Sequence, residues 1–265
     1  MEALGNAVYS VRESDRLEGH EGIVRQARFS LDGQTIATAS DDKTAKLWNS
    51  EGKAILTLPH TDLVTDVSFS PNGKIIATAT RDGTVKLWNL QGKFLRNLTE
   101  HEGNVRSVSF SPNGQTIATA IDDNTVKLWS LDGRLINTLK GHTGAVEKVT
   151  FSPNGQTIAT ASDDNTVKLW DAQGKFISTL KGHKYRVLSV SFSPDSKILA
   201  SASNDCTVRL WDVRKIKQSA PSLIYKIIHP NIVIDVIFSP DGQTIATASN
   251  DKTVRLWSSR DYTLL

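Results

Sequence analysis

The strongest constraint on the fold is the regular recurrence of tryptophan along the chain. Successive tryptophans lie 40, 41, 41, 41 and 46 residues apart, at Trp48, Trp88, Trp129, Trp170, Trp211 and Trp257. The ten-residue string SPNGQTIATA occurs without change at 111–120 and at 152–161. A repeat of about 40 residues has the length of a four-stranded β-sheet that stacks on its neighbours, so the sequence predicts a repeat architecture.

Each repeat contains signals for short strands separated by turns, as the unit over 141–180 illustrates. Its SPNG turn combines a proline, which presets one dihedral angle, with Asn-Gly, which tolerates a positive φ. The strings TIATAS, TVKLW and KFISTL that follow are typical of strands. A sheet of this kind is apolar on both faces and is stable only when stacked, and stacking in a circle leaves no long exposed edge. We therefore expect an all-β, six-bladed propeller with four antiparallel strands per blade.

We expect residues 1–265 to form one domain. Its six units extend approximately over 19–58, 59–98, 100–139, 141–180, 182–227 and 228–265. Residues 11–17 stand directly before Gly19-His20, as a fourth strand stands before Gly182-His183 in a later unit. We predict that this N-terminal strand completes the last blade and closes the ring, which leaves residues 262–265 spare or only partly paired.

Short dipeptide motifs connect these repeats with a known family. Gly-His occurs at 19–20, 141–142 and 182–183, and Trp-Asp occurs at 170–171 and 211–212. In these motifs the chain resembles the WD-repeat (WD40) β-propeller family, and its near-identical blades are similar to those of bacterial WD-repeat proteins. Seven blades are commoner than six in that family, but the chain contains six units. A seventh blade would have to come from a second chain or from sequence outside this one, so closure within one chain or through a second chain stays open at this stage.

One histidine, one aspartate and one tryptophan recur at fixed spacing in every unit. The aspartate follows the histidine by 22 residues and precedes the tryptophan by six, in the sets His20, Asp42 and Trp48; His60, Asp82 and Trp88; His101, Asp123 and Trp129; His142, Asp164 and Trp170; His183, Asp205 and Trp211; and His229, Asp251 and Trp257. The resemblance implies that each set joins a hydroxyl residue in a buried hydrogen-bonded tetrad, with hydroxyls from Thr38, Thr78, Thr119, Thr160, Ser201 and Thr247.

These tetrads contain the residue types of a hydrolase triad, which makes a catalytic interpretation an alternative. An active site occurs once in a domain, whereas this set occurs six times with a tryptophan as its fourth member. The chain has no nucleophile-elbow, P-loop or paired-cysteine metal motif. We therefore interpret the tetrads as structural, expect no catalytic residue, cofactor or metal, and keep an enzyme or a metal site in the channel as a remote alternative.

The resemblance also implies that three positions in each unit face the mouth of the central channel. The units differ at these positions, where apolar residues stand next to arginines. Our candidate partner-binding residues are Ile23, Arg25, Leu63, Arg81, Arg106, Arg186, Leu188, Ile232 and Ile234. An apolar strip with a charged rim is typical of protein contact surfaces. We expect this arc to bind a peptide or loop with an apolar anchor and acidic residues; the alternative is that these residues are merely exposed.

Composition excludes several classes of partner. The 31 basic and 28 acidic side chains are interspersed and form no block of one sign, which argues against nucleic acid. No apolar run is long enough to cross a membrane, and the single cysteine, Cys206, indicates a reducing compartment such as the cytoplasm. We expect a monomeric, non-catalytic scaffold that binds another protein or a peptide. The alternative is a regulatory or sensor module of a larger bacterial multidomain protein.

Overall fold

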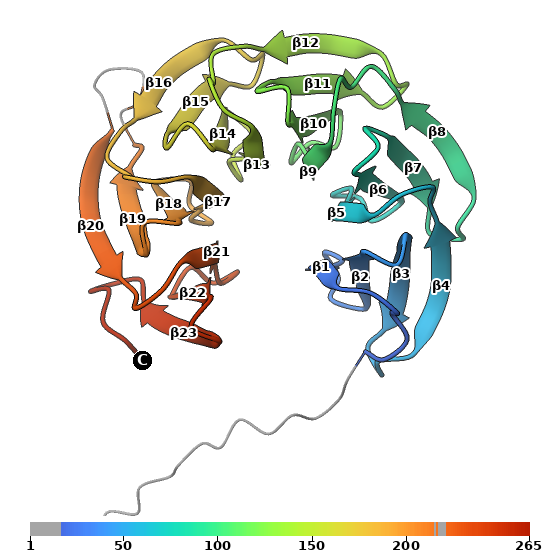
Figure 1. The fold of residues 1–265 in the computed structure, drawn as a ribbon, viewed down its shortest axis with the longest axis horizontal. Coiled ribbons are helices and arrows are strands. Elements are labelled where there is room, and N and C mark those ends of the chain that lie inside the picture. The colour runs from blue at the N-terminus through green and yellow to red at the C-terminus, as the bar shows by residue number, and fades with distance from the viewer. Residues whose placement is uncertain (1–16, 215, 217–220) are drawn as a thin grey trace, which may run out of the picture.

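The computed structural model describes residues 17–214, 216 and 221–265. They form antiparallel strands arranged as six blades around a central channel (Figure 1). In the described ranges, five blades have four strands and the last has three. The predicted all-β, six-bladed propeller is thereby confirmed. Among the described residues there is no helix that could span a membrane.

The strands follow one another from the channel outward in each blade. Blade one contains β1 (Val24–Phe29), β2 (Thr35–Ser40), β3 (Thr44–Asn49) and β4 (Ala54–Pro59). Blade two contains β5 (Val64–Phe69), β6 (Ile75–Thr80), β7 (Val85–Asn89) and β8 (Phe94–Leu98). Blade three contains β9 (Val105–Phe110), β10 (Thr116–Ile121), β11 (Val126–Ser130) and β12 (Leu135–Leu139).

The second half of the chain repeats this order. Blade four contains β13 (Val146–Phe151), β14 (Thr157–Ser162), β15 (Val167–Asp171) and β16 (Phe176–Leu180). Blade five contains β17 (Val187–Phe192), β18 (Ile198–Ser203), β19 (Thr207–Asp212) and β20 (Ser222–Ile228). Blade six contains β21 (Val233–Phe238), β22 (Thr244–Ser249) and β23 (Thr253–Ser258).

The predicted SPNG turn forms the first hairpin of blade four. The Gly155 amide donates to the Ser152 carbonyl at 2.8 Å, and Gly155 adopts a φ of +69°, which suits a residue without a Cβ. The Ser152 hydroxyl accepts a hydrogen bond from the Thr157 amide at 3.0 Å, and the Asn154 side chain accepts one from the Gln156 amide at 3.0 Å. These bonds satisfy the turn backbone and fix the register of β13 against β14.

Apolar side chains between neighbouring blades form the core. At the junction of blades three and four, the buried residues are Ala118, Ala120, Val126, Leu128 and Leu139 on one side and Val146, Val149, Phe151, Ile158 and Trp170 on the other. Small alanines in the second strand allow the sheets to approach closely, and the larger residues fill the space between them. The same pattern recurs at the other junctions, so stacking is the main source of stability.

The described blades form an arc that is open between blade six and blade one (Figure 1). Extensive contacts join the inner strands of consecutive blades from β1 through β21, whereas no contact of that extent joins β21 to β1 in the described ranges. The predicted closing strand over 11–17 lies outside the described residues except for Leu17, so it stays a prediction. Leu264 forms an isolated bridge with Trp257, at the start of the fourth-strand position of blade six.

Candidate functional site

The first strand of every blade contains a β-bulge, and the bulged residues contribute side chains to the candidate site. In β13, Val146 pairs with Ser162 and Lys148 pairs with Ala161, so Glu147 has no partner in the ladder. The same shift occurs in the other five first strands, and the unpaired residues are Arg25, Thr65, Arg106, Glu147, Leu188 and Ile234. A bulge redirects the side chain of its extra residue. Each blade therefore presents one bulged side chain to the channel, and these side chains are basic, acidic, polar or aliphatic.

These six bulged residues line one cavity at the channel mouth. The cavity has a volume of about 510 Å³ and is also lined by Asp41, Leu63, Arg81, Asn104 and Asp122. Of the predicted partner-binding residues, it brings together Arg25, Leu63, Arg81, Arg106, Leu188 and Ile234. The other three, Ile23, Arg186 and Ile232, do not line it.

Acidic residues of the chain itself neutralise three of the four predicted arginines. Arg25 forms two hydrogen bonds of 2.7 Å with the Asp41 carboxylate, and its guanidinium holds the pKa of that carboxyl below its usual range. Arg106 lies between Asp122 and Glu147, with its Nη1 3.5 Å from Glu147 Oε2. The mouth is therefore a rim of paired charges rather than a uniformly basic surface.

The remaining two arginines differ in their pairing. Arg186 Nη1 lies 3.4 Å from Asp163 Oδ2, which belongs to the preceding blade. Arg81 is exposed, lines the cavity and makes no ion pair within the described part of the chain. Of the four predicted arginines, Arg81 can therefore bind an external carboxylate without breaking an ion pair within the described part of the chain.

The residues that follow the bulges form the floor of the cavity, which the sequence did not reveal. Lys148 Nζ lies 3.2 Å from Asp66 Oδ2, although these residues belong to blades four and two. The side chain of Asp66 is only 2% exposed, and its carboxylate also accepts a hydrogen bond from the Val108 amide at 3.1 Å. Burial raises the pKa of this carboxyl, but Lys148 and Arg28 outweigh burial and lower it below the usual range. The pair ties non-adjacent blades together across the channel.

Glu147 is a titratable group at the channel mouth whose pKa lies near neutral pH. Burial raises the pKa of its carboxyl to about 7, with a further contribution from Asp163, and the Arg106 guanidinium partly offsets the shift. Its charge therefore changes close to physiological pH. A partner that contacts this part of the rim meets a carboxyl group that can either donate or accept a hydrogen bond.

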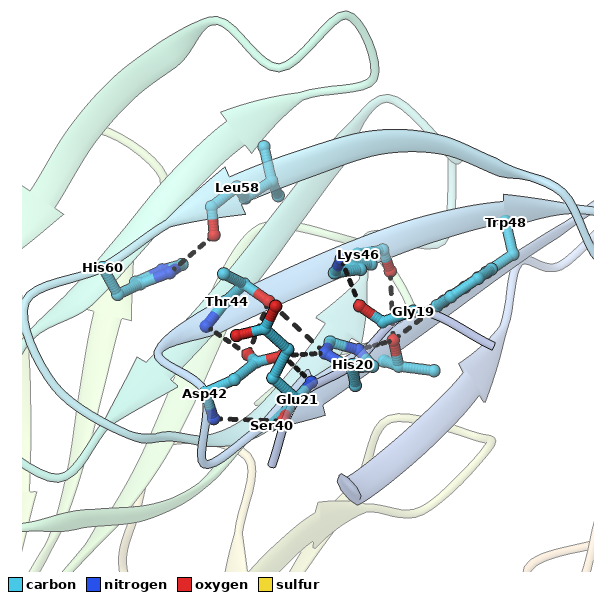
Figure 2. A network of polar contacts seen from close by, with 11 residues as sticks. Gly19, His20, Glu21, Ser40, Asp42, Thr44, Lys46, Trp48, Leu58 and His60 are labelled. Carbon is cyan, nitrogen blue, oxygen red and sulfur yellow. Dashed lines mark hydrogen bonds and ion pairs between the residues drawn. The ribbon is translucent and has the colours of Figure 1, made fainter. Parts of the chain in front are cut away.

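The predicted tetrads have complete hydrogen-bond chains in blades one, four and five. In blade one, His20 Nδ1 lies 2.7 Å from Asp42 Oδ2 and its Nε2 lies 2.6 Å from the Thr38 hydroxyl (Figure 2). The indole of Trp48 donates to the same hydroxyl at 2.8 Å. Blades four and five repeat these contacts at 2.7–3.1 Å, with Thr160 and Ser201 as the hydroxyl residues.

In blades two, three and six the histidine does not bond to its aspartate. His60 Nδ1 donates to the Leu58 carbonyl at 3.0 Å, and Asp82 instead accepts from Thr61. His101 Nδ1 has no partner among the described residues. In blade six Arg255 stands between the two, 2.8 Å from His229 Nδ1 and 2.7 Å from Asp251 Oδ2. The bond from the tryptophan indole to the hydroxyl is present in all three blades.

The residue before the histidine explains this division. Gly19, Gly141 and Gly182 precede the histidines of the complete tetrads and adopt φ values of +137°, +154° and +146°. These angles are unfavourable for residues with a Cβ. The other three histidines follow Pro59, Glu100 and Ile228, whose backbones do not adopt positive φ. Without that backbone conformation, the imidazole does not bond to its aspartate; His60 and His101 still reach their hydroxyls, whereas His229 Nε2 has no partner among the described residues.

In the complete tetrads the imidazole, carboxylate, hydroxyl and indole groups bond to one another. A neutral imidazole with its proton on Nδ1 donates to the aspartate, accepts from the hydroxyl, and leaves that oxygen to accept from the indole. The His142 and His183 side chains are each 1% exposed. Burial raises the pKa of the Asp42 carboxyl, but hydrogen bonds from Thr44 and His20 hold it well below its usual range. This arrangement braces the loops of a blade. The described residues contain no cluster of three His, Cys, Asp or Glu side chains suited to a metal.

The incomplete tetrads predict how stability depends on pH. Burial, together with Lys86 or Lys127, lowers the pKa values of His60 and His101 to about 4. The unfolded chain therefore binds more protons than the folded chain between about pH 4 and 6.5, and stability falls as the pH falls through this window. We expect each of these two imidazoles to lower the free energy of unfolding by about 2 kcal/mol between pH 7 and pH 5.

Urea unfolding at pH 7 and pH 5 checks this expectation. Glu147 titrates in the opposite sense, because its folded pKa is raised and its protonation stabilises the fold as the pH falls. The measurement is therefore made on Glu147→Gln chains. Adding His60→Gln and His101→Gln should make the pH dependence shallower, while burial still lowers the pKa values of His183 and His229 in these chains. An equally steep dependence would contradict the assignment.

Two protein-family models match the chain. One, described as the second β-propeller of the echinoderm microtubule-associated protein, matches residues 64–228, which is more than half of the chain. The other, described as WD domain, G-beta repeat, matches residues 11–49 and 222–258. No curated protein matches the chain. The matched segments contain most of the repeating strands and turns described above, and all tetrad residues except His60.

Proposed function

Because the chain belongs to the WD-repeat β-propeller family, we propose that it is a non-catalytic scaffold that binds a protein or peptide partner at the channel mouth. Propellers of this family generally serve as protein-interaction scaffolds. The observation that carries the proposal is the ring of bulged residues. The framework around them is nearly identical from blade to blade, whereas the bulged side chains are charged, polar or apolar. This distribution supports recognition by the mouth rather than by the repeated framework.

The apolar side of the mouth supplies the anchor site. Leu63, Leu188 and Ile234 line the cavity, and Ile234 is 47% exposed. Ile23 lies beyond the cavity and is 66% exposed. Burying exposed aliphatic side chains against a partner gains about 25 cal/mol per Å² of apolar surface. We propose that an apolar side chain of the partner docks here, with an acidic group on Arg81.

We also propose that the tetrads are structural rather than catalytic and that the protein works in a reducing compartment. The hydroxyl groups of the complete tetrads are fully engaged in hydrogen bonds, which supports a structural role for them. Cys206 is the only cysteine, so no disulfide within the chain stabilises the fold. This supports a reducing compartment such as the cytoplasm.

A paired substitution at the mouth tests the proposal. Ile23→Ser with Ile234→Ser should abolish recovery of the partner in an affinity pull-down and leave the unfolding temperature nearly unchanged. The reason is that both side chains are exposed and contribute little to the core. Recovered proteins are identified by mass spectrometry, and unfolding is followed by circular dichroism.

A matched control lies on the outer strands. Ile55 in β4 and Ile136 in β12 are each 53% exposed, so Ile55→Ser with Ile136→Ser removes the same number of exposed isoleucines away from the mouth. The control should keep the partner. Equal recovery by both double variants would discard binding at the mouth.

A further inference from the structure

The loops that lead into the blades carry opposite charges on opposite sides of the channel mouth. These loops hold the tetrad histidines and reach the mouth, where Leu63 and Asn104 line the cavity. Leaving the histidines aside, the charged residues of the loops into blades one to three are all acidic: Glu18, Glu21, Asp62, Glu100 and Glu102. Those of the loops into blades four and five are all basic: Lys140, Lys181, Lys184 and Arg186. We call these two sets the acidic half and the basic half of the mouth face.

The two halves lie on opposite sides of the molecule. Blades one to three occupy one side of the arc in Figure 1, and blades four to six occupy the other. The loop into blade six has no charged residue besides His229, but the second hairpin of that blade adds the exposed Lys252 to the basic side. The cations Lys43 and Arg81 lie in hairpins on the acidic side, where the five carboxylates outnumber them. The charge of the mouth face therefore changes sign from one side to the other.

The charges of both halves are available to another molecule. Arg186 pairs with Asp163, but the other members form no ion pair within the described part of the chain. All of them are exposed except Asp62, which is half-buried. The arginines nearer the channel differ, because Arg25 and Arg106 are paired with carboxylates of their own blades. The outer loops, and not the inner rim, thus carry most of the unpaired charge of this face.

The two halves are complementary to each other under a two-fold rotation. When a second copy is turned over about a line between blades three and four, its blade four faces blade three of the first copy, its blade five faces blade two, and its blade six faces blade one. Glu102 then lies on the side of Lys140 of the other copy, Asp62 on the side of Lys184, and Glu21 on the side of Lys252. Each of these pairings occurs twice, and such a contact closes at two chains.

We propose that the mouth face binds the same face of a second copy of this chain, with the acidic half of each on the basic half of the other. The pair also covers Tyr185, which is 62% exposed in the loop into blade five and would lie on blade two of the other copy. Tyrosine contributes a large contact area in such surfaces. The proposal rests on the charge pattern and not on the function proposed above. Because the pair covers the mouth, pairing and binding of the proposed partner exclude each other.

Other classes of occupant match one half of the face and not the other. A nucleic acid or an anionic membrane would be attracted by the basic half and repelled by the acidic half. A uniformly basic partner would meet the reverse situation. A second copy carries both complementary charges at the required separation, because the same blades set that separation in both molecules.

Static light scattering at increasing protein concentration tests the proposal. We expect the mass to rise from one chain to two with a dissociation constant of about 10–100 µM at about 50 mM salt, because several exposed ion pairs, each weak, act together. Raising the salt to about 500 mM should weaken the pair at least about tenfold. A mass that stays at one chain up to about 500 µM at the lower salt, or that grows beyond two chains, would contradict the proposal.

Charge reversal shows which surfaces meet. One variant reverses the acidic half with Glu21→Lys, Glu100→Lys and Glu102→Lys, and the other reverses the basic half with Lys140→Glu, Lys181→Glu and Lys184→Glu. These side chains are exposed, so both variants should keep the fold. Each variant alone should stay at one chain, because like charges then face each other, whereas an equimolar mixture should pair about as tightly as the unmodified chain. Pairing by either variant alone, or failure of the mixture to pair, would overturn the proposal.

A matched control lies at the opposite end of the blades. Lys53, Lys93 and Lys175 are exposed in the turns between third and fourth strands. Replacing all three with glutamate changes the net charge as much as reversal of the basic half does. This control should pair like the unmodified chain. If it lost pairing as completely, net charge and not the mouth face would govern association, and the proposal would be wrong.

Discussion

Replacing Lys148 with methionine is expected to lower the free energy of unfolding by about 3–5 kcal/mol. The substitution keeps the aliphatic stem but removes the ion-pair partner of the Asp66 carboxylate, which is 2% exposed in the floor of the channel, and leaves only the influence of Arg28. Removing the paired cation of a buried carboxylate is costly, because the remaining charge then lies in the interior without its ion-pair partner. Guanidinium unfolding followed by fluorescence measures the loss.

A second substitution separates charge pairing from packing. Lys148→Met with Asp66→Asn removes both charges, and the asparagine oxygen can still accept the hydrogen bond from the Val108 amide. The double variant should recover at least half of the lost stability. If the double variant were as unstable as Lys148→Met alone, the loss would come from packing and not from the ion pair across the channel.

Thr160→Val is expected to lower the free energy of unfolding by about 2–4 kcal/mol. Valine has nearly the shape of threonine, so packing is retained, but two buried groups lose their partners. The indole of Trp170 donates to Thr160 at 3.1 Å, and His142 Nε2 lies 2.7 Å from the same oxygen. Thermal and chemical unfolding both measure the effect.

Blade six provides the comparison for this substitution. Thr247 accepts from Trp257 at 2.9 Å, but His229 Nε2 has no partner among the described residues. Thr247→Val therefore removes one of the two contacts and should cost about half as much as Thr160→Val. Equal costs in the two blades would mean that the imidazole link contributes nothing to stability.

The sequence predicts the blades because their signals are local. Proline and glycine set the first hairpin turn, and the recurring tryptophan sets the register of the repeat, so both can be read within one unit of about 40 residues. The same reasoning explains why tetrad completeness could have been predicted: glycine precedes His20, His142 and His183 and no other histidine. The fixed spacing alone predicts six equal tetrads, which the structure does not have.

The features that join distant units were not predictable in this way. Asp66 and Lys148 are 82 residues apart, and nothing in either unit indicates that the channel brings them together. The bulges that present Arg25 and Glu147 depend on the pairing of two strands and not on a residue type. The opening between blade six and blade one depends on how all the described blades stack, which no single repeat specifies.

The most direct test of the mouth as a binding surface is amide hydrogen exchange of the chain with its captured partner bound. Binding at the mouth predicts slower exchange at the bulged ends of the inner strands, around Arg25, Thr65, Leu188 and Ile234, with the outer strands β4, β8, β12 and β16 unchanged. Protection confined to those outer strands, with the inner strands unchanged, would contradict the account.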